Sequence, residues 1–315
     1  MSGTSKLTVV GAGAVGSSVA YAAMIRGSAR HIALYDIAPE KTEAEVLDLA
    51  HGSFFAGSGE ITGGSDVSVA ADSDVVVITA GAKQKPGQTR IELAATNARI
   101  MDALMPQLLE VAPDAIYVVV TNPCDVLTML AAESSGLPPE RIFASGTTLD
   151  SSRLRWEIAR RAGVATASVH AQIVGEHGDT ELALWSSATI GTVPILDWTQ
   201  DGAPLFTRED LDAIAADVRD AAYTVIRGKG ATNYAIGLSS ARIVEAILRD
   251  EHAVLPVAPV LHGVHGLDGV ALSVPCVVDA AGARPLPGTP FAPEELDRLH
   301  ESAESLRRVA AELRG

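Results

Sequence analysis

Short apolar runs alternate with longer segments of mixed polarity along the first half of the chain. Strands are predicted at residues 7–10, 31–35, 75–79 and 116–120, and helices at residues 15–26 and 41–50. The last two strands are continuous, mostly β-branched runs, as expected for strands that are buried on both faces. Strands that alternate with helices favour an α/β fold with a parallel, doubly wound sheet.

The pattern loosens after about residue 145. Helices are predicted at residues 154–161, 208–226, 236–248 and 293–313, and strands at residues 253–261 and 270–278. This mixture predicts an α+β second domain, and 315 residues are enough for two domains that each bury a core. We therefore expect one domain at residues 1–145 and a second at residues 146–315. Because no low-complexity linker separates them, the two should share one continuous interface.

A glycine-rich turn, GAGAVG at residues 11–16, lies between the first predicted strand and helix. In this context Gly11 permits the tight turn, Gly13 lets the backbone approach a pyrophosphate, and Gly16 brings the helix close to the strand. Asp36 follows Gly16 by 20 residues, where a carboxylate would bind ribose hydroxyls and repel a 2′-phosphate. The motif predicts a Rossmann domain that binds NAD rather than NADP. A structural glycine turn and a flavin site are the alternatives, although no second flavin motif is visible.

His177 lies in the segment IVGEHGDTE at residues 173–181, just after an apolar, strand-like run. A histidine at a strand end can transfer a proton near neutral pH, because its pKa lies close by. Taken alone, such a histidine is more often a structural residue than a catalyst. Its interpretation therefore depends on other segments.

Three further segments carry candidate chemistry. Residues 81–90 follow a buried strand and contain Pro-Gly, which indicates a loop that could close as a lid or simply be solvated surface. Asn122 follows another buried strand at the sheet edge where ligands bind, although Asn-Pro also marks ordinary turns. Asp150 and Arg153 are spaced i, i+3 at a helix start, which is also the spacing of a surface ion pair.

Charge and cysteine content narrow the function. The 24 basic and 39 acidic residues give a net charge of −15, which disfavours binding to nucleic acid or to anionic membranes. An anionic substrate would have to be attracted by local arginines. The two cysteines, Cys124 and Cys276, have neither a disulfide framework nor a metal-ligand spacing, so no metal is expected. The glycine turn comes too early for a signal peptide and no apolar run could span a bilayer, so we expect a soluble, cytoplasmic protein.

Together, the segments AGAKQKPGQTR, TNPCD, GTTLDSSRLR, GEHGDTE and GKGAT resemble the lactate/malate dehydrogenase family, and within it the bacterial L-lactate dehydrogenases. The resemblance covers nearly the whole chain. It implies a Rossmann domain followed by a mixed α+β catalytic domain. It also implies NAD as cofactor and reversible reduction of pyruvate to L-lactate, a step of fermentation that follows glycolysis.

The resemblance also implies a role for each matching residue. His177 would donate the proton, and Asp150 would orient His177. Arg153 would anchor the substrate carboxylate, and Arg90 would polarise the substrate carbonyl from the lid. Further substrate-binding residues would be Gln84, Asn122, Asp125 and Thr232. Cofactor-binding residues would be Gly11, Gly13, Val15, Gly16, Asp36, Lys41, Gly81, Ala82, Thr121, Asn122, Ser145 and Ile236.

Gln84 indicates which substrate is used. The resemblance places this position against the variable end of the substrate, where malate dehydrogenases carry an arginine that pairs with a second carboxylate. A neutral glutamine predicts pyruvate rather than oxaloacetate. A malate dehydrogenase or a dehydrogenase for a bulkier 2-hydroxy acid is the alternative within the family. A non-catalytic NAD-sensing protein is the alternative outside it, but a sensor has no need of a proton donor.

Arg155 and His170 carry a regulatory prediction. Arg155 is two residues after Arg153, so on a helix the two side chains point to nearly opposite sides. His170 lies seven residues before His177, in the apolar strand that is predicted to lead to it. The resemblance includes bacterial enzymes that bind fructose 1,6-bisphosphate with an arginine and a histidine at these positions, across a subunit interface. It implies a homotetramer in which this effector shifts the subunits toward the state that binds pyruvate well. The alternative is a surface arginine in an ordinary ion pair and a structural histidine.

Overall fold

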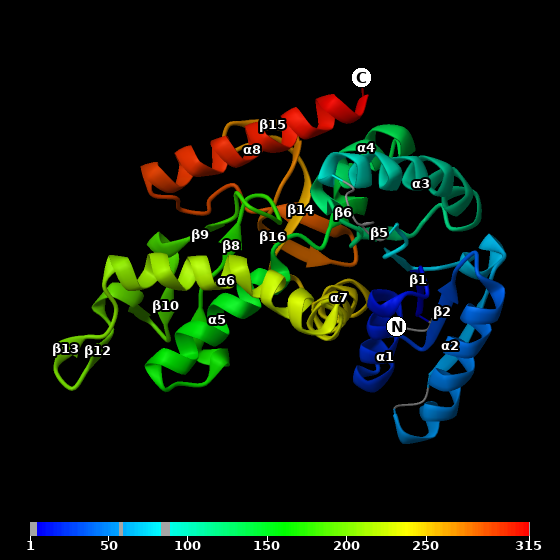
Figure 1. Cartoon of the computed structure of the whole chain (residues 1–315), viewed down its shortest axis with the longest axis horizontal. Coiled ribbons are helices and arrows are strands. Elements are labelled where there is room, and N and C mark those ends of the chain that lie inside the picture. The colour runs from blue at the N-terminus through cyan, green and yellow to red at the C-terminus, as the bar shows by residue number, and fades with distance from the viewer. Residues whose placement is uncertain (1–4, 57–58, 83–88, 315) are drawn as a thin grey trace.

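A ten-stranded sheet with helices on both faces forms the centre of the computed structural model (Figure 1), which describes residues 5–56, 59–82 and 89–314. Six of its strands are parallel and follow the order β6-β5-β4-β1-β2-β3. They are β1 (Lys6–Val10), β2 (His31–Tyr35), β3 (Glu60–Gly64), β4 (Val75–Ile78), β5 (Ile116–Val119) and β6 (Ile142–Ala144). This is the doubly wound order of a Rossmann fold, with its switch point between β1 and β4, and it confirms the predicted fold class.

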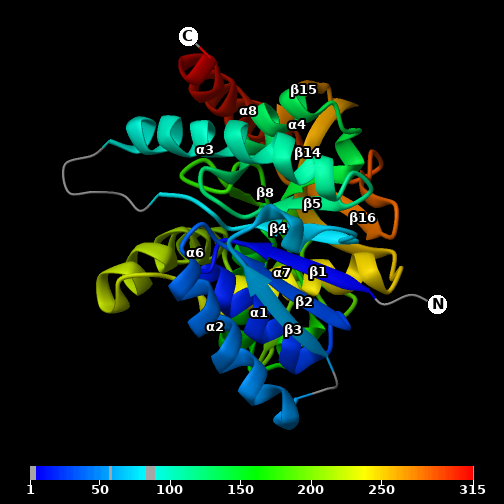
Figure 2. The same ribbon diagram turned by 90° about the vertical axis from the view of Figure 1, so that its right-hand side faces the viewer.

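Helices pack on both faces of these strands because successive side chains of each strand point to opposite faces. Figures 1 and 2 show α3 (Arg90–Val111) and α4 (Cys124–Ser135) on one face, and α1 (Ala14–Arg26) and α7 (Tyr234–Leu248) on the other. In β4, Val76 and Ile78 join the core under α3 and α4, whereas Val75 and Val77 join the opposite core. Helix α2 (Pro39–Gly52) packs beside β3.

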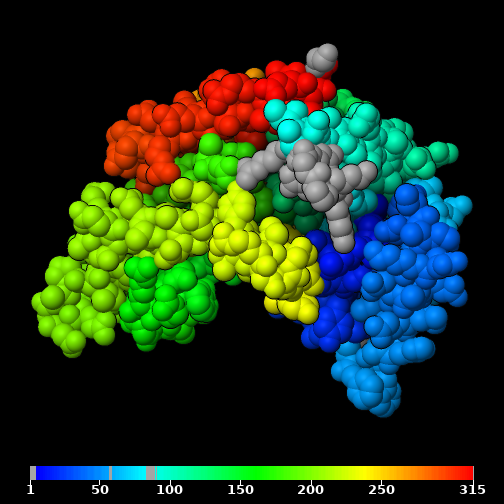
Figure 3. Space-filling view, viewed as in Figure 1, coloured from blue at the N-terminus to red at the C-terminus, as the bar shows by residue number. Residues whose placement is uncertain are grey.

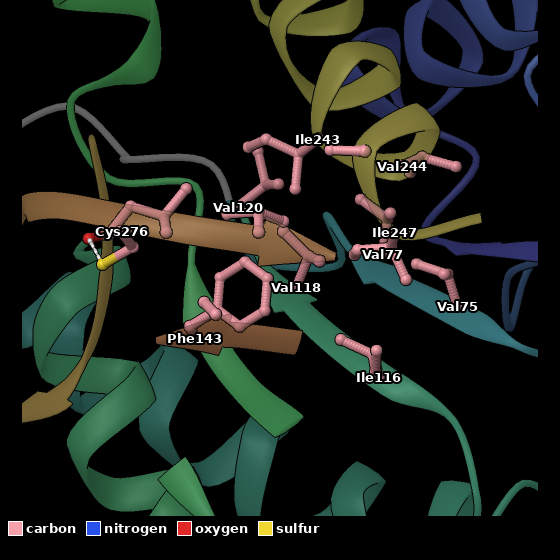
Figure 4. Close-up of a cluster of buried hydrophobic side chains, with 14 of the residues drawn as sticks. Val75, Val77, Ile116, Val118, Val120, Phe143, Ile243, Val244, Ile247 and Cys276 are labelled. Carbon is pink, nitrogen blue, oxygen red and sulfur yellow. Dashed lines mark hydrogen bonds between the residues drawn. The ribbon is translucent and has the colours of Figure 1, made fainter. Parts of the chain in front are cut away.

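The core between the sheet and α7 contains side chains that are far apart in the sequence. Figure 4 shows Val77 and Val118 pointing toward Ile243, Val244 and Ile247 of α7. All five are buried. A helix from the second half of the chain therefore completes a core of the parallel sheet.

The second half of the chain extends the same sheet. Strand β14 (Ala253–Val264) pairs antiparallel with β6, and β16 (Val274–Asp279) and β17 (Gly282–Pro285) follow outward. A further core forms between helices α5 (Thr148–Ala162) and α6 (Arg208–Lys229) and short strands. The remaining strands are β7 (Val169–His170), β8 (Ile173–Val174), β9 (Leu182–Ala183), β10 (Thr189–Ile190), β11 (Val193–Pro194), β12 (Thr199–Gln200), β13 (Ala203–Pro204) and β15 (Leu267–Ala271), and the last helix is α8 (Pro293–Arg314).

This arrangement confirms the predicted mixed second part, but two of its predicted elements differ. The strand predicted at residues 270–278 is two strands, β15 and β16, because Ser273 leaves the ladder and pairs with Gly175 instead. The helix predicted at residues 154–161 begins at Thr148, so it includes Asp150 and Arg153. Since β14 joins β6 in one sheet, the division at residues 145 and 146 stays a prediction. Within the described residues, no helix is long and apolar enough to cross a membrane.

Candidate active site

The glycine-rich turn between β1 and α1 leaves no room for a side chain at Gly11 or Gly16. Gly11 has φ +102°, and a Cβ on it would lie 2.7 Å from the Ala80 nitrogen. A Cβ on Gly16 would lie 1.8 Å from the Gly11 oxygen, so helix and strand can approach only with glycine here. A Cβ on Gly13 would meet open space at the start of α1. Open space before a helix N-terminus fits the pyrophosphate of a dinucleotide.

Asp36 is held beside this turn at the end of β2. One carboxylate oxygen accepts a hydrogen bond from the Ala12 nitrogen at 2.7 Å, and the other accepts one from the Ala38 nitrogen at 3.1 Å. Backbone donors fix the carboxylate next to the glycine turn. This position agrees with the predicted preference for NAD, because a negative charge here would repel a 2′-phosphate.

Other residues predicted to bind the cofactor follow the carboxyl ends of neighbouring parallel strands. Gly81 and Ala82 follow β4, Thr121 and Asn122 follow β5, and Ser145 follows β6. The remaining three are on helices: Val15 in α1, Lys41 in α2 and Ile236 in α7. Those that follow strands lie along one edge of the sheet, where ligands bind in this fold.

Asn97 is a residue that sequence reasoning missed at this edge. Its side chain, 3% exposed, accepts a hydrogen bond from the Ala82 nitrogen and donates one to the Asn122 oxygen, both at 2.8 Å. It therefore ties the segments after β4 and β5 together. The available signal was an amide on the otherwise apolar buried face of α3, since a buried polar group needs partners.

His177 lies in the loop of a β-hairpin formed by β8 and β9. Its Nδ1 is 2.6 Å from Oδ2 of Asp150, and Oδ1 of Asp150 accepts a hydrogen bond from Nη1 of Arg153, also at 2.6 Å. The Asp150 side chain is 3% exposed, whereas 24% of the His177 side chain remains accessible. Because Nδ1 is engaged with Asp150, Nε2 is the ring nitrogen that can meet a substrate.

Charge pairing sets the protonation of this cluster. The negative charge of Asp150 outweighs burial and raises the pKa of His177 to about 9. Burial alone would raise the pKa of Asp150, but the positive charges of His177 and Arg153 outweigh it and the pKa is lowered. At neutral pH the pair is therefore an imidazolium and a carboxylate, and His177 has a proton to donate.

Asp125, predicted from the resemblance to contact substrate, is 2% exposed. Its Oδ2 accepts a hydrogen bond from the His177 backbone nitrogen at 2.7 Å, and burial raises its pKa to about 7. The carboxyl group thus holds the loop that carries His177 to the start of α4, just beyond β5. A direct substrate contact by Asp125 stays a prediction.

Hydroxyl groups that sequence reasoning also missed fasten the surrounding elements. Ser151 of α5 accepts a hydrogen bond from the Ile173 nitrogen at 2.8 Å, and Thr147 donates one to the Ile173 oxygen at 2.6 Å. From α8, Ser302 accepts a hydrogen bond from the Glu176 nitrogen at 2.9 Å. These contacts hold the hairpin that carries His177 against α5 and α8.

The remaining predicted substrate residues lie on either side of this cluster in the chain. Gln84 is outside the described residues, and Arg90 is the first residue of α3. Thr232 is in the short connection between α6 and α7. Their contacts with substrate stay predictions.

Arg155 and His170 line one cavity of about 690 Å³, together with Ala171, Gln172 and Thr289 among others. Arg155 donates a hydrogen bond from Nε to the Ala171 oxygen at 2.8 Å. His170 is in β7, which pairs with β10 and is separate from the hairpin of His177, so the single strand expected between the two histidines is wrong. The two predicted effector residues therefore lie close together.

Comparison with known proteins gives the family. Residues 5–144 match the family described as lactate/malate dehydrogenase, NAD binding domain, and residues 147–313 match its alpha/beta C-terminal domain. An L-lactate dehydrogenase of Bifidobacterium animalis subsp. lactis is 51% identical over 98% of this chain and 96% of its own length. One from Kosmotoga olearia is 44% identical over 96% of this chain and 94% of its own length.

Solved structures agree with these relatives. The minor L-lactate dehydrogenase from Enterococcus mundtii, in its ligand-bound form, has a TM-score of 0.94 and is 40% identical, covering 98% of both chains. MGS-M5, a lactate dehydrogenase from a deep-sea metagenome library, has a TM-score of 0.94 and is 38% identical, covering 99% of both chains. The chain belongs to the lactate/malate dehydrogenase family, and its first part is the NAD-binding domain of that family.

Proposed function

We propose that the protein is an NAD-dependent L-lactate dehydrogenase that reversibly reduces pyruvate to L-lactate. The observation that carries this proposal is the hydrogen-bonded set of His177, Asp150 and Arg153. Asp125 ties this set to the carboxyl edge of the parallel sheet, beside the dinucleotide-binding segments. The relatives from Bifidobacterium animalis, Kosmotoga olearia and Enterococcus mundtii are named L-lactate dehydrogenases, which supports the choice of substrate.

Each side chain of the set has a separate task. Arg153 has a planar group of donors, so it can bind the substrate carboxylate with the N–H groups that Asp150 does not use. His177 donates its Nε2 proton to the carbonyl oxygen of the keto acid as that oxygen becomes a hydroxyl. Asp150 keeps the ring oriented and stabilises its positive charge before the transfer. Bound NADH supplies the hydride to the carbonyl carbon.

The reverse reaction uses the same groups in the opposite protonation state. Lactate binds when His177 is neutral, so that Nε2 can accept the hydroxyl proton. The raised pKa of His177, about 9, keeps the ring protonated at neutral pH, which is the state that binds pyruvate. Arg90, delivered by a closed lid, would stabilise the charge that develops on the oxygen.

The proposal is tested by following the loss of NADH absorbance with pyruvate, oxaloacetate and branched 2-keto acids. Turnover with pyruvate supports the proposal. Turnover with oxaloacetate alone would make the protein a malate dehydrogenase, and turnover only with branched acids would indicate another 2-hydroxy acid dehydrogenase. Binding of NADH with no turnover would indicate an NAD-sensing protein.

We also propose a homotetramer that fructose 1,6-bisphosphate activates through Arg155 and His170. Burial lowers the pKa of Arg155, as expected for a cation whose charge is poorly solvated and would be stabilised by a phosphate. The shared cavity of about 690 Å³ has room for such a ligand. Without the effector, paired cationic clusters of neighbouring subunits would repel one another.

Exposed apolar side chains support self-association. Figure 3 shows a concave margin between α5 and α1, and a cavity of about 440 Å³ there is lined by residues of α1, α5 and α7, including Leu238. Phe54 and Phe55, at the end of α2, are 88% and 87% exposed. Adjacent exposed aromatic side chains such as Phe54 and Phe55 are one sign of a protein–protein interface.

Fructose 1,6-bisphosphate should lower the pyruvate concentration needed for half-saturation, and Arg155→Ala or His170→Ala should abolish this effect. Because histidine binds phosphate best when protonated, activation should strengthen as the pH falls toward about 6. Pyruvate saturation curves with and without the effector measure both. Arg160→Ala, which removes an exposed arginine from the same helix, is the matched control. An unchanged half-saturation in the parent protein would contradict the regulatory proposal and leave the catalytic one intact.

A further inference from the structure

Glu181 is a third carboxyl group beside the pair of His177 and Asp150. It ends the hairpin loop that carries His177 and is 5% exposed. A ligand atom of each of these three side chains lies within 4.8 Å of the others. Within the described part of the chain, Oε1 of Glu181 is buried and has no hydrogen-bond partner. The mechanism above gives this group no role, although a buried carboxyl group next to a proton donor is costly.

Charged groups from three elements face Glu181. Asp150 and Arg153 come from α5, His177 from the same loop, and Arg219 from α6. Nε of Arg219 is also buried without a partner among the described residues. The other acidic groups of the loop are engaged elsewhere: Glu176 accepts a hydrogen bond from Thr180, and Asp179 accepts one from Tyr223.

Two neighbouring buried carboxyl groups do not readily ionise together. Asp150 holds its negative charge because His177 and Arg153 both pair with it. Glu181 forms no such pair in the described structure, so the proton stays on Glu181. Burial, followed by the charge of Asp150, raises the pKa of Glu181 to about 8.

We propose that Glu181 is a positioning residue that stays protonated during turnover, and that its ionisation weakens the binding of the anionic 2-keto acid. Of the charged groups around Glu181, His177, Arg153 and Arg219 are positive and Asp150 is negative, so the substrate carboxylate meets a net positive charge while Glu181 is neutral. An ionised Glu181 lowers this charge by one unit and so weakens the attraction. The inference rests on the proposed role of His177 as proton donor.

The dependence of pyruvate kcat/KM on pH should have a specific form at alkaline pH. Asp125 loses its proton near pH 7 in the parent and in Glu181 variants alike. Above pH about 8 the protein loses the proton of Glu181 and then that of His177, whose pKa is about 9. When two protons are required, kcat/KM falls by about 100-fold per pH unit at the limit, and when one is required it falls by about 10-fold. Loss of the Glu181 proton should appear mainly as a rise in KM for pyruvate, because Glu181 acts on substrate binding.

The test compares the parent with Glu181→Gln, which keeps the shape of the side chain and cannot ionise. Pyruvate kcat/KM is measured from pH 6 to 10 at saturating NADH. In a plot of log kcat/KM against pH, the limiting slope at high pH should be near −2 in the parent and near −1 in the variant. Below pH 7 the two should agree within about threefold. The affinity for oxamate, an unreactive analogue of pyruvate, should show the same difference in the number of protons. The matched control is Glu157→Gln on α5, because this carboxylate pairs with Arg160 instead. Its limiting slope should stay near −2, as in the parent.

Arg219→Gln gives an independent check should Glu181→Gln fold poorly. Arg219 favours the ionised form of Glu181, so its removal should move the first proton loss to higher pH. A parent slope of −1, or a slope of −2 that persists in Glu181→Gln, would overturn the proposal even if pyruvate turnover is normal. Absence of turnover with any 2-keto acid would instead contradict the proposed function, and the oxamate titration would still decide the role of Glu181.

Discussion

Replacing His177 with alanine should lower the rate of pyruvate reduction by about 100-fold to 10,000-fold, the usual contribution of general acid catalysis. His177 holds the proton that the carbonyl oxygen needs, with Nδ1 bonded to Asp150 and Nε2 left for the substrate. NADH binding should persist, because the glycine turn between β1 and α1 does not depend on this side chain. Steady-state rates at pH 7, together with NADH titration by fluorescence, measure the two effects separately.

His262→Ala is the matched control for this variant. His262 is 62% exposed and pairs with Asp268, on β14 and β15, and its removal should leave the rate unchanged. A His177→Ala variant within threefold of the parent would remove His177 from the role of proton donor. A variant that also loses NADH binding would instead indicate that the site had collapsed.

The second large effect is expected for Gln84→Arg, which should raise turnover of oxaloacetate and depress turnover of pyruvate. Leaving a buried charge without its partner costs roughly 3–5 kcal/mol, on the order of a hundredfold to a few thousandfold in selectivity. In the parent, the second carboxylate of oxaloacetate lacks a partner. In the variant, the new guanidinium lacks a partner when pyruvate is bound.

The ratio of kcat/KM for oxaloacetate to that for pyruvate measures this change. Gln88→Arg, in the same segment, adds the same charge at a different position and serves as the control. If the ratio does not move in Gln84→Arg, that residue does not face the substrate. If both variants move it equally, the added charge acts on the whole site rather than at one contact.

Local patterns predicted most of the parallel sheet. Residues 75–78 and 116–119 are apolar at successive positions, and both form strands with a buried face on each side. The first turn of α5 was harder to predict, because Asp150 and Ser151 are polar residues at buried positions. Their burial makes sense only with the partners that the folded chain supplies. The same applies to Ser273, which interrupts the strand predicted at residues 270–278 by pairing with Gly175.

The sequence by itself determined the Rossmann topology, the glycine turn, and the residue types needed at the site. These depend on short-range features: the alternation of strand and helix, and the spacing of the glycines between the first strand and the first helix. They also depend on the resemblance of five short segments to one family. The positions of His177, Asp150 and Arg153 in the chain could therefore be assigned roles before any geometry was known.

Only the tertiary structure decided how these residues are held and charged. Asp125 bonds to the backbone of His177 across 52 positions of sequence, and Asp150 bonds to its ring across 27. Glu181 is four residues from His177, yet its protonation depends on burial and on Asp150 and Arg219 from two separate helices. The free energy of a buried charge depends on its solvent exposure and on all charges around it, and neither quantity is a property of a local segment.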